Sequence, residues 1–277
     1  EGARGKMATP KLGKGLGRKA DAPDHRDLVL EARHMAPLHA AGAPLPTAVD
    51  VFLGLDLPVY DQGALGSCTA NSAVLYRRFL ARRFAKYSAA DTDLSRLFLY
   101  YQERKLPWNS DVNSDSGAAM RDAVYVLAHT GVCPEADDPY RTVDFSSDSL
   151  NNNERDLSAA APFRIGAYHR VPDAPTARQV LASGYAVLLG FQVYPSFEEI
   201  RGDGLLPLPM QGETPLGGHA VVIRGYDDSR ACFYIQNSWG HSWGDHGCFW
   251  MPYEYVERPE ISEPDMWMGH LGKPWRI

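Results

Sequence analysis

Cysteine is scarce in this sequence, and long apolar runs are missing. Four cysteines in 277 residues, none of them in a CxxC pair, supply neither a disulfide framework nor a zinc site. No apolar stretch approaches the roughly 20 residues that cross a bilayer, and no basic start followed by an apolar segment marks a secretory leader. We therefore expect no membrane association, and the sequence leaves the cellular compartment open.

Basic residues are also too few for a nucleic-acid-binding protein. Lys and Arg number 28 against 34 Asp and Glu, which gives a formal net charge of −6. Residues 1–20 nevertheless hold six basic residues and one acid, so the rest of the chain carries −11. We expect a basic arm in front of an acidic body, and the 44% hydrophobic content predicts that this body folds.

Composition divides the chain into an arm and a two-lobed body. The arm lacks hydrophobic periodicity, and its first six residues precede Met7 and look like an addition to the native chain. The predicted boundaries are an arm over 1–45, a body over 46–277, a helical lobe over about 46–145, a β-rich lobe over about 160–257 and a C-terminal extension over 258–277. Residues 143–160 are polar and predict a surface connection.

Hydrophobic periodicity places helices before strands. Helical spacing predicts helices over 68–87, 118–130 and 176–183. Short runs rich in Val, Ile, Phe, Tyr and Trp predict strands over 186–193, 219–226, 231–236 and 248–251. Because strands and helices do not alternate, the fold class is α+β.

Cys68 stands where a helix is predicted to begin, directly after Ser67, a good N-cap. A sulfur in the first turn faces unpaired N–H groups and the positive end of the helix dipole, which favour thiolate over thiol. The alternative is a small buried hydrophobic residue, which describes most single cysteines.

Three further residues favour a catalytic thiol. Gln62, in "YDQGALGSC", can bring a side-chain amide back to the helix start, where it and the Cys68 backbone N–H would form an oxyanion hole. His219, in "LGGHA", can take the thiol proton and later protonate an amine. Asn237, in "IQNSWG", can hold the imidazole in the productive tautomer.

These stretches resemble the papain-like cysteine peptidases. "QGALGSCTANS", "GGHAVVIRGY" and "NSWGHSWGDHG" occur in the family's order, with His219 lying 151 residues after Cys68 and Asn237 eighteen after His219. "LGSCTANS", "LSRLFLYYQER" and "GVCPEADDPY" are similar to the bacterial branch of the family. The resemblance covers about residues 45–251 and implies a helical lobe and an antiparallel, β-barrel-like lobe with the active-site cleft between them.

Carried over by position, the resemblance implies that Cys68 is the nucleophile, His219 the acid and base, Asn237 the orienting residue and Gln62 the oxyanion donor. It also implies that Trp239 shields the bond between Asn237 and His219.

The residues expected to bind substrate are Gly117, Gly218, Trp239 and Trp243. Gly117 resembles the glycine whose backbone pairs with substrate, although a glycine required by the start of a helix explains it equally well. Gly218 leaves space beside the imidazole. Trp243 is expected in the core or on the leaving-group side of the cleft.

Two positions depart from the family pattern. Leu65 stands where many members carry a cysteine that forms a disulfide, and Thr69 replaces the usual aromatic residue after the nucleophile. The common bridge of the helical lobe is therefore absent.

We expect a monomeric cysteine endopeptidase that cleaves protein or peptide substrates through a thioester, without a metal or organic cofactor. A resting thiolate–imidazolium pair is expected at Cys68 and His219. The arm is interpreted as a short inhibitory prosegment, because its charge is opposite to that of the body. Two alternatives stay open: a thiol-dependent amidase or acyltransferase on the same fold, and a non-catalytic peptide-binding relative.

Overall fold

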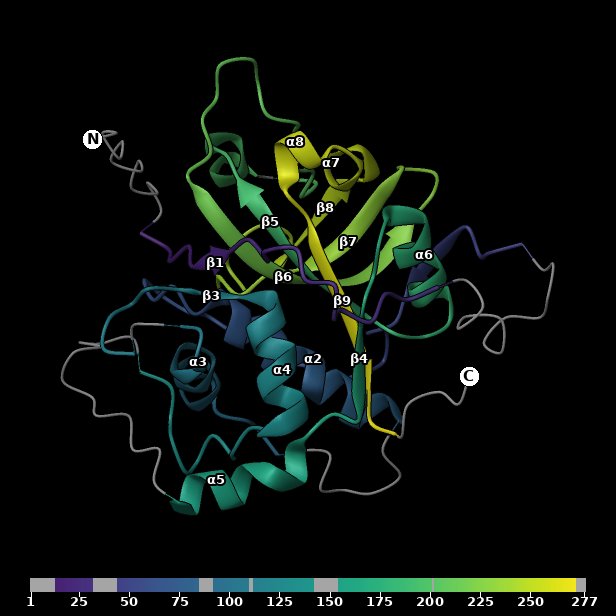
Figure 1. Cartoon of the computed structure of the whole chain (residues 1–277). Helices are drawn as coiled ribbons and strands as arrows, with labels where there is room; N and C mark the ends of the chain where they lie inside the picture. Colours follow the sequence, from purple (N-terminus) through teal and green to yellow (C-terminus); the bar gives the residue numbers. More distant parts are fainter. Residues whose placement is uncertain are drawn as a thin grey trace.

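The structure is a computed structural model, and it describes residues 13–31, 44–84, 92–109, 112–141, 154–200 and 202–272. Helices α2, α3 and α4 gather on one side, and a large sheet stands on the other side of the molecule (Figure 1). The purple trace of the arm runs between these two parts. Among the described residues, none of the helices combines the length and the apolar character needed to cross a membrane.

Helices form mainly where apolar residues recur with helical spacing. In chain order they are α2 (Cys68–Phe84), α3 (Arg96–Lys105), α4 (Met120–His129), α5 (Glu154–Ala160), α6 (Ala174–Ala182), α7 (Tyr253–Glu257) and α8 (Pro259–Ser262), with short 3-10 turns at Ala161–Phe163 and Pro195–Glu199. Helix α2 is buried on all sides over its first fourteen residues, because it packs against α3 and α4 as well as against the sheet. The side chain of Ser95 caps α3 by accepting a hydrogen bond from the Phe98 amide.

The strands form one large sheet and one short pair. They are β1 (Arg18–Lys19), β2 (Ala48–Asp50), β3 (Ala118–Ala119), β4 (Ala167–Arg170), β5 (Val187–Val193), β6 (Gly217–Asp227), β7 (Cys232–Gln236), β8 (Cys248–Pro252) and β9 (Asp265–His270). The large sheet has the order β4-β9-β5-β6-β7-β8, with β2 pairing to β6, and all these pairings are antiparallel. Within the described residues no pairing joins β4 to β8, so the antiparallel sheet of the lobe expected to be barrel-like does not close into a barrel.

The predicted elements recur with shifted ends. Helix α2 begins at Cys68 as predicted, and residues 85–91 lie outside the described residues. The second predicted helix starts two residues late, because Ala118–Ala119 pairs as strand β3 with the arm strand β1. The prediction had no helix over 96–105, and α5 forms inside the stretch predicted to be a connection.

The predicted end of the β-rich lobe at about residue 257 differs from the structure. Strand β9 lies between β4 and β5 inside the sheet, so Asp265–His270 are part of the β-rich lobe, although they fall in the stretch predicted to be an extension. All six β9 residues are buried, which removes the alternation of apolar and polar residues that marks a half-exposed strand. Strand β2, from the start of the body, also joins this sheet through β6.

Candidate active site

The Cys68 thiol lies fully buried at the first residue of α2, where the helix start meets β6. The backbone amides of Gly17, Ala220 and Thr69 lie close enough to the sulfur to stabilise its anion. Ala220 follows His219 in β6, so the sulfur is next to the strand that carries the imidazole. The structure therefore brings together two residues that are 151 positions apart.

His219 and Asn237 form a direct hydrogen bond. His219 Nε2 and Asn237 Oδ1 are 2.7 Å apart, and the same oxygen accepts a 2.8 Å hydrogen bond from the Ser238 backbone N–H. Since an oxygen that accepts from Ser238 cannot also donate, Nε2 of the neutral ring carries the proton. Nδ1 is then unprotonated; it is buried and has no hydrogen-bond partner among the described residues. This tautomer is the one that can accept a proton from a thiol.

An aromatic cluster encloses this hydrogen bond. The rings of His219 and Trp239 are 4.9 Å apart between centroids, and Trp239 is only 1% exposed. Phe197 and Trp243 pack against Trp239 at 5.1 and 5.2 Å. The position of Trp239 fits the shielding role that the resemblance implied. Trp243 is a buried member of the same cluster, and its role toward the leaving group stays a prediction.

Gln62, the expected oxyanion donor, is fully buried in the loop that leads into α2, and its role stays a prediction. Its Nε2 donates to the carbonyl oxygens of Leu65 at 2.8 Å and of Gly15 at 3.1 Å. Its Oε1 accepts a 2.7 Å hydrogen bond from the Ser238 hydroxyl. The amide is thus fixed in orientation, and a carbonyl of the arm occupies one of its donor directions.

Ser238 is a site residue that the sequence reasoning missed. Its hydroxyl orients Gln62, and its backbone N–H orients Asn237, so one residue serves both sides of the site. The available signal was its place in "NSWG", between two residues already assigned. A small hydroxyl residue there has no chemistry of its own, and only the fold brings Gln62 to it.

The arm passes directly over Cys68, with the Gly17 amide close to its sulfur. The Gly15 amide donates to Gly63 O at 3.0 Å, and Gly17 O accepts from the Ala118 amide at 2.9 Å. Strand β1 pairs in parallel with β3 and also contacts β6, so the arm lies between the two lobes.

Glycines allow this close approach. A Cβ on Gly117 would lie 2.0 Å from Gly17 O, and one on Gly218 would lie 2.1 Å from Arg18 O. Real Cβ atoms do not come this close to other heavy atoms, so both positions need glycine while the arm is docked. Both expected substrate-binding glycines therefore lie under the arm, and their contact with substrate stays a prediction.

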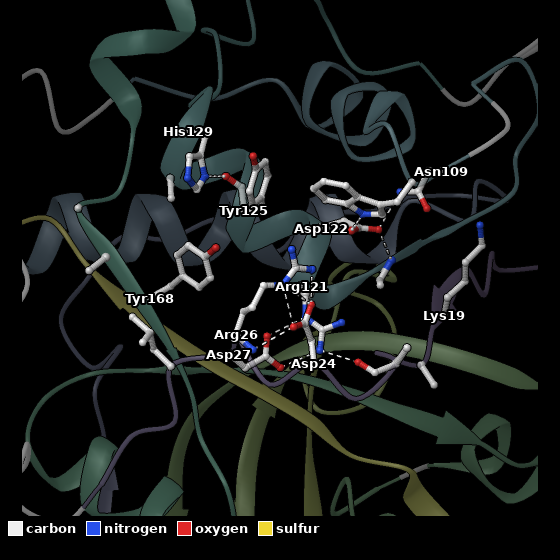
Figure 2. A pocket seen from close by; sticks show the side chains of 18 residues that line it. Lys19, Asp24, Arg26, Asp27, Asn109, Arg121, Asp122, Tyr125, His129 and Tyr168 are labelled. Carbon is white, nitrogen blue, oxygen red and sulfur yellow. Dashed lines mark hydrogen bonds and ion pairs between the residues drawn. The ribbon is translucent and has the colours of Figure 1, made fainter.

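An ion pair and hydrogen bonds hold the part of the arm that follows Arg18. Figure 2 shows Arg121 of α4 in direct contact with Asp27 of the arm, and both residues line a cavity that the arm helps to form. Arg121 Nη2 and Asp27 Oδ2 are 2.7 Å apart. Asp21 accepts from the indole of Trp267 at 2.8 Å, and Leu30 donates its amide to Arg170 O at 2.8 Å. The arm is thus anchored from the active site to the edge of the sheet.

The two family departures have local explanations. Thr69 donates its hydroxyl to Glu103 at 2.7 Å inside the helical lobe, where burial raises the pKa of Glu103 well above its usual value. Leu65, at the position of one cysteine of that disulfide, packs in a small apolar cluster with Leu97. All four cysteines are unpaired.

Burial shifts the pKa values of both Cys68 and His219. Desolvation raises the pKa of the Cys68 thiol to about 11, in spite of the nearby amides. Desolvation also lowers the pKa of His219 to about 4, against the opposing effect of the Asn237 hydrogen bond. The covered site therefore favours a neutral thiol and a neutral imidazole. The expected ion pair stays a prediction for the cleft without its arm.

Alkylation of Cys68 is expected to depend on the arm. In the intact chain, reaction with iodoacetamide should be slow at pH 7 and rise toward pH 11, because only the thiolate reacts. Removal of the arm admits water, lowers the pKa and should increase the rate at pH 7 about 100-fold. Mass spectrometry at residue 68 measures this rate, with Cys232 as the internal reference. Equal, pH-independent rates with and without the arm would contradict it.

Removing the Ser238 hydroxyl is expected to slow catalysis through Gln62. For this test the arm-free chain is the folded protein cut at a protease site inserted between residues 31 and 44, with the arm washed away at high salt. In this form Ser238→Ala should lower kcat on a peptide amide by about tenfold with little change in KM, since loss of an oxyanion donor itself costs about 100-fold or more. Unchanged kcat would show that Gln62 needs no support from Ser238.

The geometry defines a class of protein: a two-lobed fold that brings a thiol, an imidazole and a side-chain amide together between a group of helices and a sheet. The chain belongs to the family described as "Papain family cysteine protease", whose sequence pattern matches residues 45–264. It is a papain-like cysteine peptidase by this membership, and the expected two-lobed papain-like fold is confirmed.

Relatives agree on the family. The chain is similar to the solved structure of xylellain, a cysteine protease from Xylella fastidiosa, with 34% identity, a TM-score of 0.82 and coverage of 94% of this chain and 97% of that one. An uncharacterized peptidase C1-like protein of Acanthamoeba polyphaga mimivirus is 29% identical over 95% of this chain and 88% of its own length. The procathepsin B S9 structure from Trypanosoma congolense, 14% identical with a TM-score of 0.71 over 92% of this chain and 86% of that one, shares the fold.

Proposed function

We propose that the chain is a cysteine endopeptidase that forms a thioester intermediate and is made as a zymogen, with its own arm as the inhibitor. The hydrogen bond between His219 and Asn237 carries the chemical part of this proposal. It leaves Nδ1 of His219 unprotonated, and His219 directly precedes Ala220, the residue whose amide stabilises the Cys68 thiolate.

The residues supply each proton and charge that the reaction needs. His219 Nδ1 takes the thiol proton, and the sulfur attacks the carbonyl carbon of the peptide bond. The Gln62 side-chain amide and the Cys68 backbone amide stabilise the negative oxygen. His219 then protonates the departing amine, which leaves an acyl group on the sulfur. Water attacks this thioester with His219 as base, which restores the thiol and releases a carboxylic acid.

The inhibitory role of the arm follows from what it occupies. Gly15 O takes a hydrogen bond from the oxyanion donor Gln62, and the Gly17 amide faces the sulfur. A substrate carbonyl requires the same positions. Turnover therefore requires the arm to leave, and proenzyme structures among the fold neighbours support this interpretation.

A direct experiment compares intact and arm-free chains on a mixture of protein-derived peptides and simple amides. Mass spectrometry should find internal peptide cleavage by the arm-free chain, and a peptidyl epoxide should label Cys68. Hydrolysis of non-peptide amides alone, or acyl transfer to added amines, would favour the amidase or acyltransferase. Absence of both labelling and products would favour the non-catalytic relative.

A further inference from the structure

The arm carries a basic side chain into a buried pocket beside Cys68. The Arg18 side chain has no exposed surface, although a guanidinium is costly to remove from water. Its Nη2 donates to the Asp265 carboxylate and to the backbone carbonyl of Glu263. The pocket thus ends in two acceptors, one of them charged.

The sheet fixes the depth of this pocket. Gly190 of β5 pairs with Ala220 of β6 on one side and with Asp265 of β9 on the other. Neighbouring strands are about 4.8 Å apart, so the Asp265 backbone lies about 10 Å from that of Ala220, whose amide touches the sulfur. Arg18 follows Gly17, whose amide lies at the Cys68 sulfur, and its long side chain spans this distance. A long side chain at the corresponding position of a substrate would span it too.

Two glycines keep the channel open. A Cβ on Gly190 would lie 2.8 Å from Arg18 Nε, and one on Gly218 would lie 2.9 Å from Arg18 Cδ. Met120 of α4 lies beside the same space, 3.0 Å from the Gly190 Cβ position. The absence of two side chains in adjacent strands makes room for an extended stem.

Asp265 divides its two oxygens between the body and the arm. Oδ1 pairs with Arg170 of β4 at 2.7 Å. Oδ2 binds Arg18 and the Asp21 amide, and both of these partners belong to the arm. When the arm leaves, Oδ2 loses both partners and faces the channel. Because only Nη2 of Arg18 makes hydrogen bonds there among the described residues, a lysine ammonium could make the same contacts.

We propose that this pocket selects substrates with arginine or lysine immediately before the residue whose carbonyl is attacked, and that Asp265 determines this choice. The proposal rests on the proposed peptidase function. In the intact chain Arg18 occupies this pocket. Once the arm has left, the basic side chain of a substrate takes its place.

The test uses the arm-free chain and fluorogenic dipeptide amides with arginine at the scissile position. The residue before it is arginine, lysine, leucine or phenylalanine. We expect kcat/KM to be at least about tenfold higher with arginine or lysine than with leucine, as a charge-assisted hydrogen bond provides. Asp265→Asn should lower this ratio at least about tenfold. Glu257→Gln, an exposed acid at the end of α7, should leave the ratio unchanged.

A second variant tests the shape of the pocket. Gly190→Ala should reduce hydrolysis of the arginine and lysine substrates more than that of a substrate with alanine in the same position. A preference for leucine or phenylalanine in the arm-free chain, or a ratio unaffected by Asp265→Asn, would overturn the inference while leaving the peptidase function intact. If no peptide is cleaved, the proposed function fails. Calorimetry then measures the binding of arginine and leucine dipeptides to the arm-free Cys68→Ala protein. Tighter binding of the arginine dipeptide would support the basic pocket independently of catalysis.

Discussion

Replacing Cys68 with alanine is expected to lower peptide hydrolysis by the arm-free chain about 10⁴-fold or more. In the proposed mechanism the sulfur forms the thioester, and without it the oxyanion donors have no nucleophile to assist. Alanine keeps the Cβ and removes a single buried atom at the start of a helix, so the fold should persist. Steady-state rates on one peptide amide, together with thermal unfolding of both proteins, measure the effect.

The matched control is Cys232→Ala, which removes another buried and unpaired thiol. Its rate should stay within about twofold of the parent chain. A Cys68→Ala protein that retains more than about one hundredth of the activity would contradict a thiol mechanism. If the Cys68→Ala protein is active and the Cys232→Ala protein is inactive, Cys68 is not the nucleophile.

Gly17→Ala in the intact chain is expected to raise peptidase activity about 100-fold, without any cut in the chain. A Cβ at this position would lie 1.8 Å from Gly66 O, so the arm cannot keep its path over Cys68. Displacement gives up the hydrogen bonds of Gly15 and the buried contact of Arg18, which together hold the arm. A loss of about 2.7 kcal/mol in the free energy of docking the arm corresponds to a 100-fold larger population of the form with the arm displaced. Initial rates on a peptide amide, before any self-cleavage, measure it.

Ala20→Ser serves as the control, because residue 20 is exposed on the same segment. It should leave the intact chain as slow as the parent. If Gly17→Ala and the parent have equal rates, and cutting the arm away also changes nothing, the arm is not an inhibitor. If cutting activates and Gly17→Ala does not, the arm tolerates a shifted path.

The sequence was most informative where one short segment carries both the chemistry and the local structure. Cys68 was placed at a helix start by its own N-terminal neighbours and by the apolar spacing that follows, and the helix begins there. His219 and Asn237 were placed on adjacent strands by a turn between two apolar runs, and the structure pairs those strands. In both cases the signal was local, and the resemblance to a family set the order of the segments.

Features that depend on distant pairings were not predictable. Strand β9 is buried on both faces, so nothing in its sequence distinguished a central strand from a tail. Ser238 acts through Gln62, which is 176 positions away, and a serine has no pattern that announces such a partner. The arm was identified by its charge, but the pocket for Arg18 is built from three strands and one helix that only the fold brings together.

The ties between residues 60–62 and 238–240 have a mechanical consequence. The Gln62 amide donates to Ser238 O and the Gly240 amide donates to Tyr60 O, each at 2.9 Å, while the Ser238 hydroxyl holds the Gln62 side chain. A hinge between the oxyanion donor and the imidazole would break all three bonds at once. We therefore expect these two segments to keep their relative position, so that under the proposed zymogen mechanism substrate enters when the arm leaves and not when the two lobes separate.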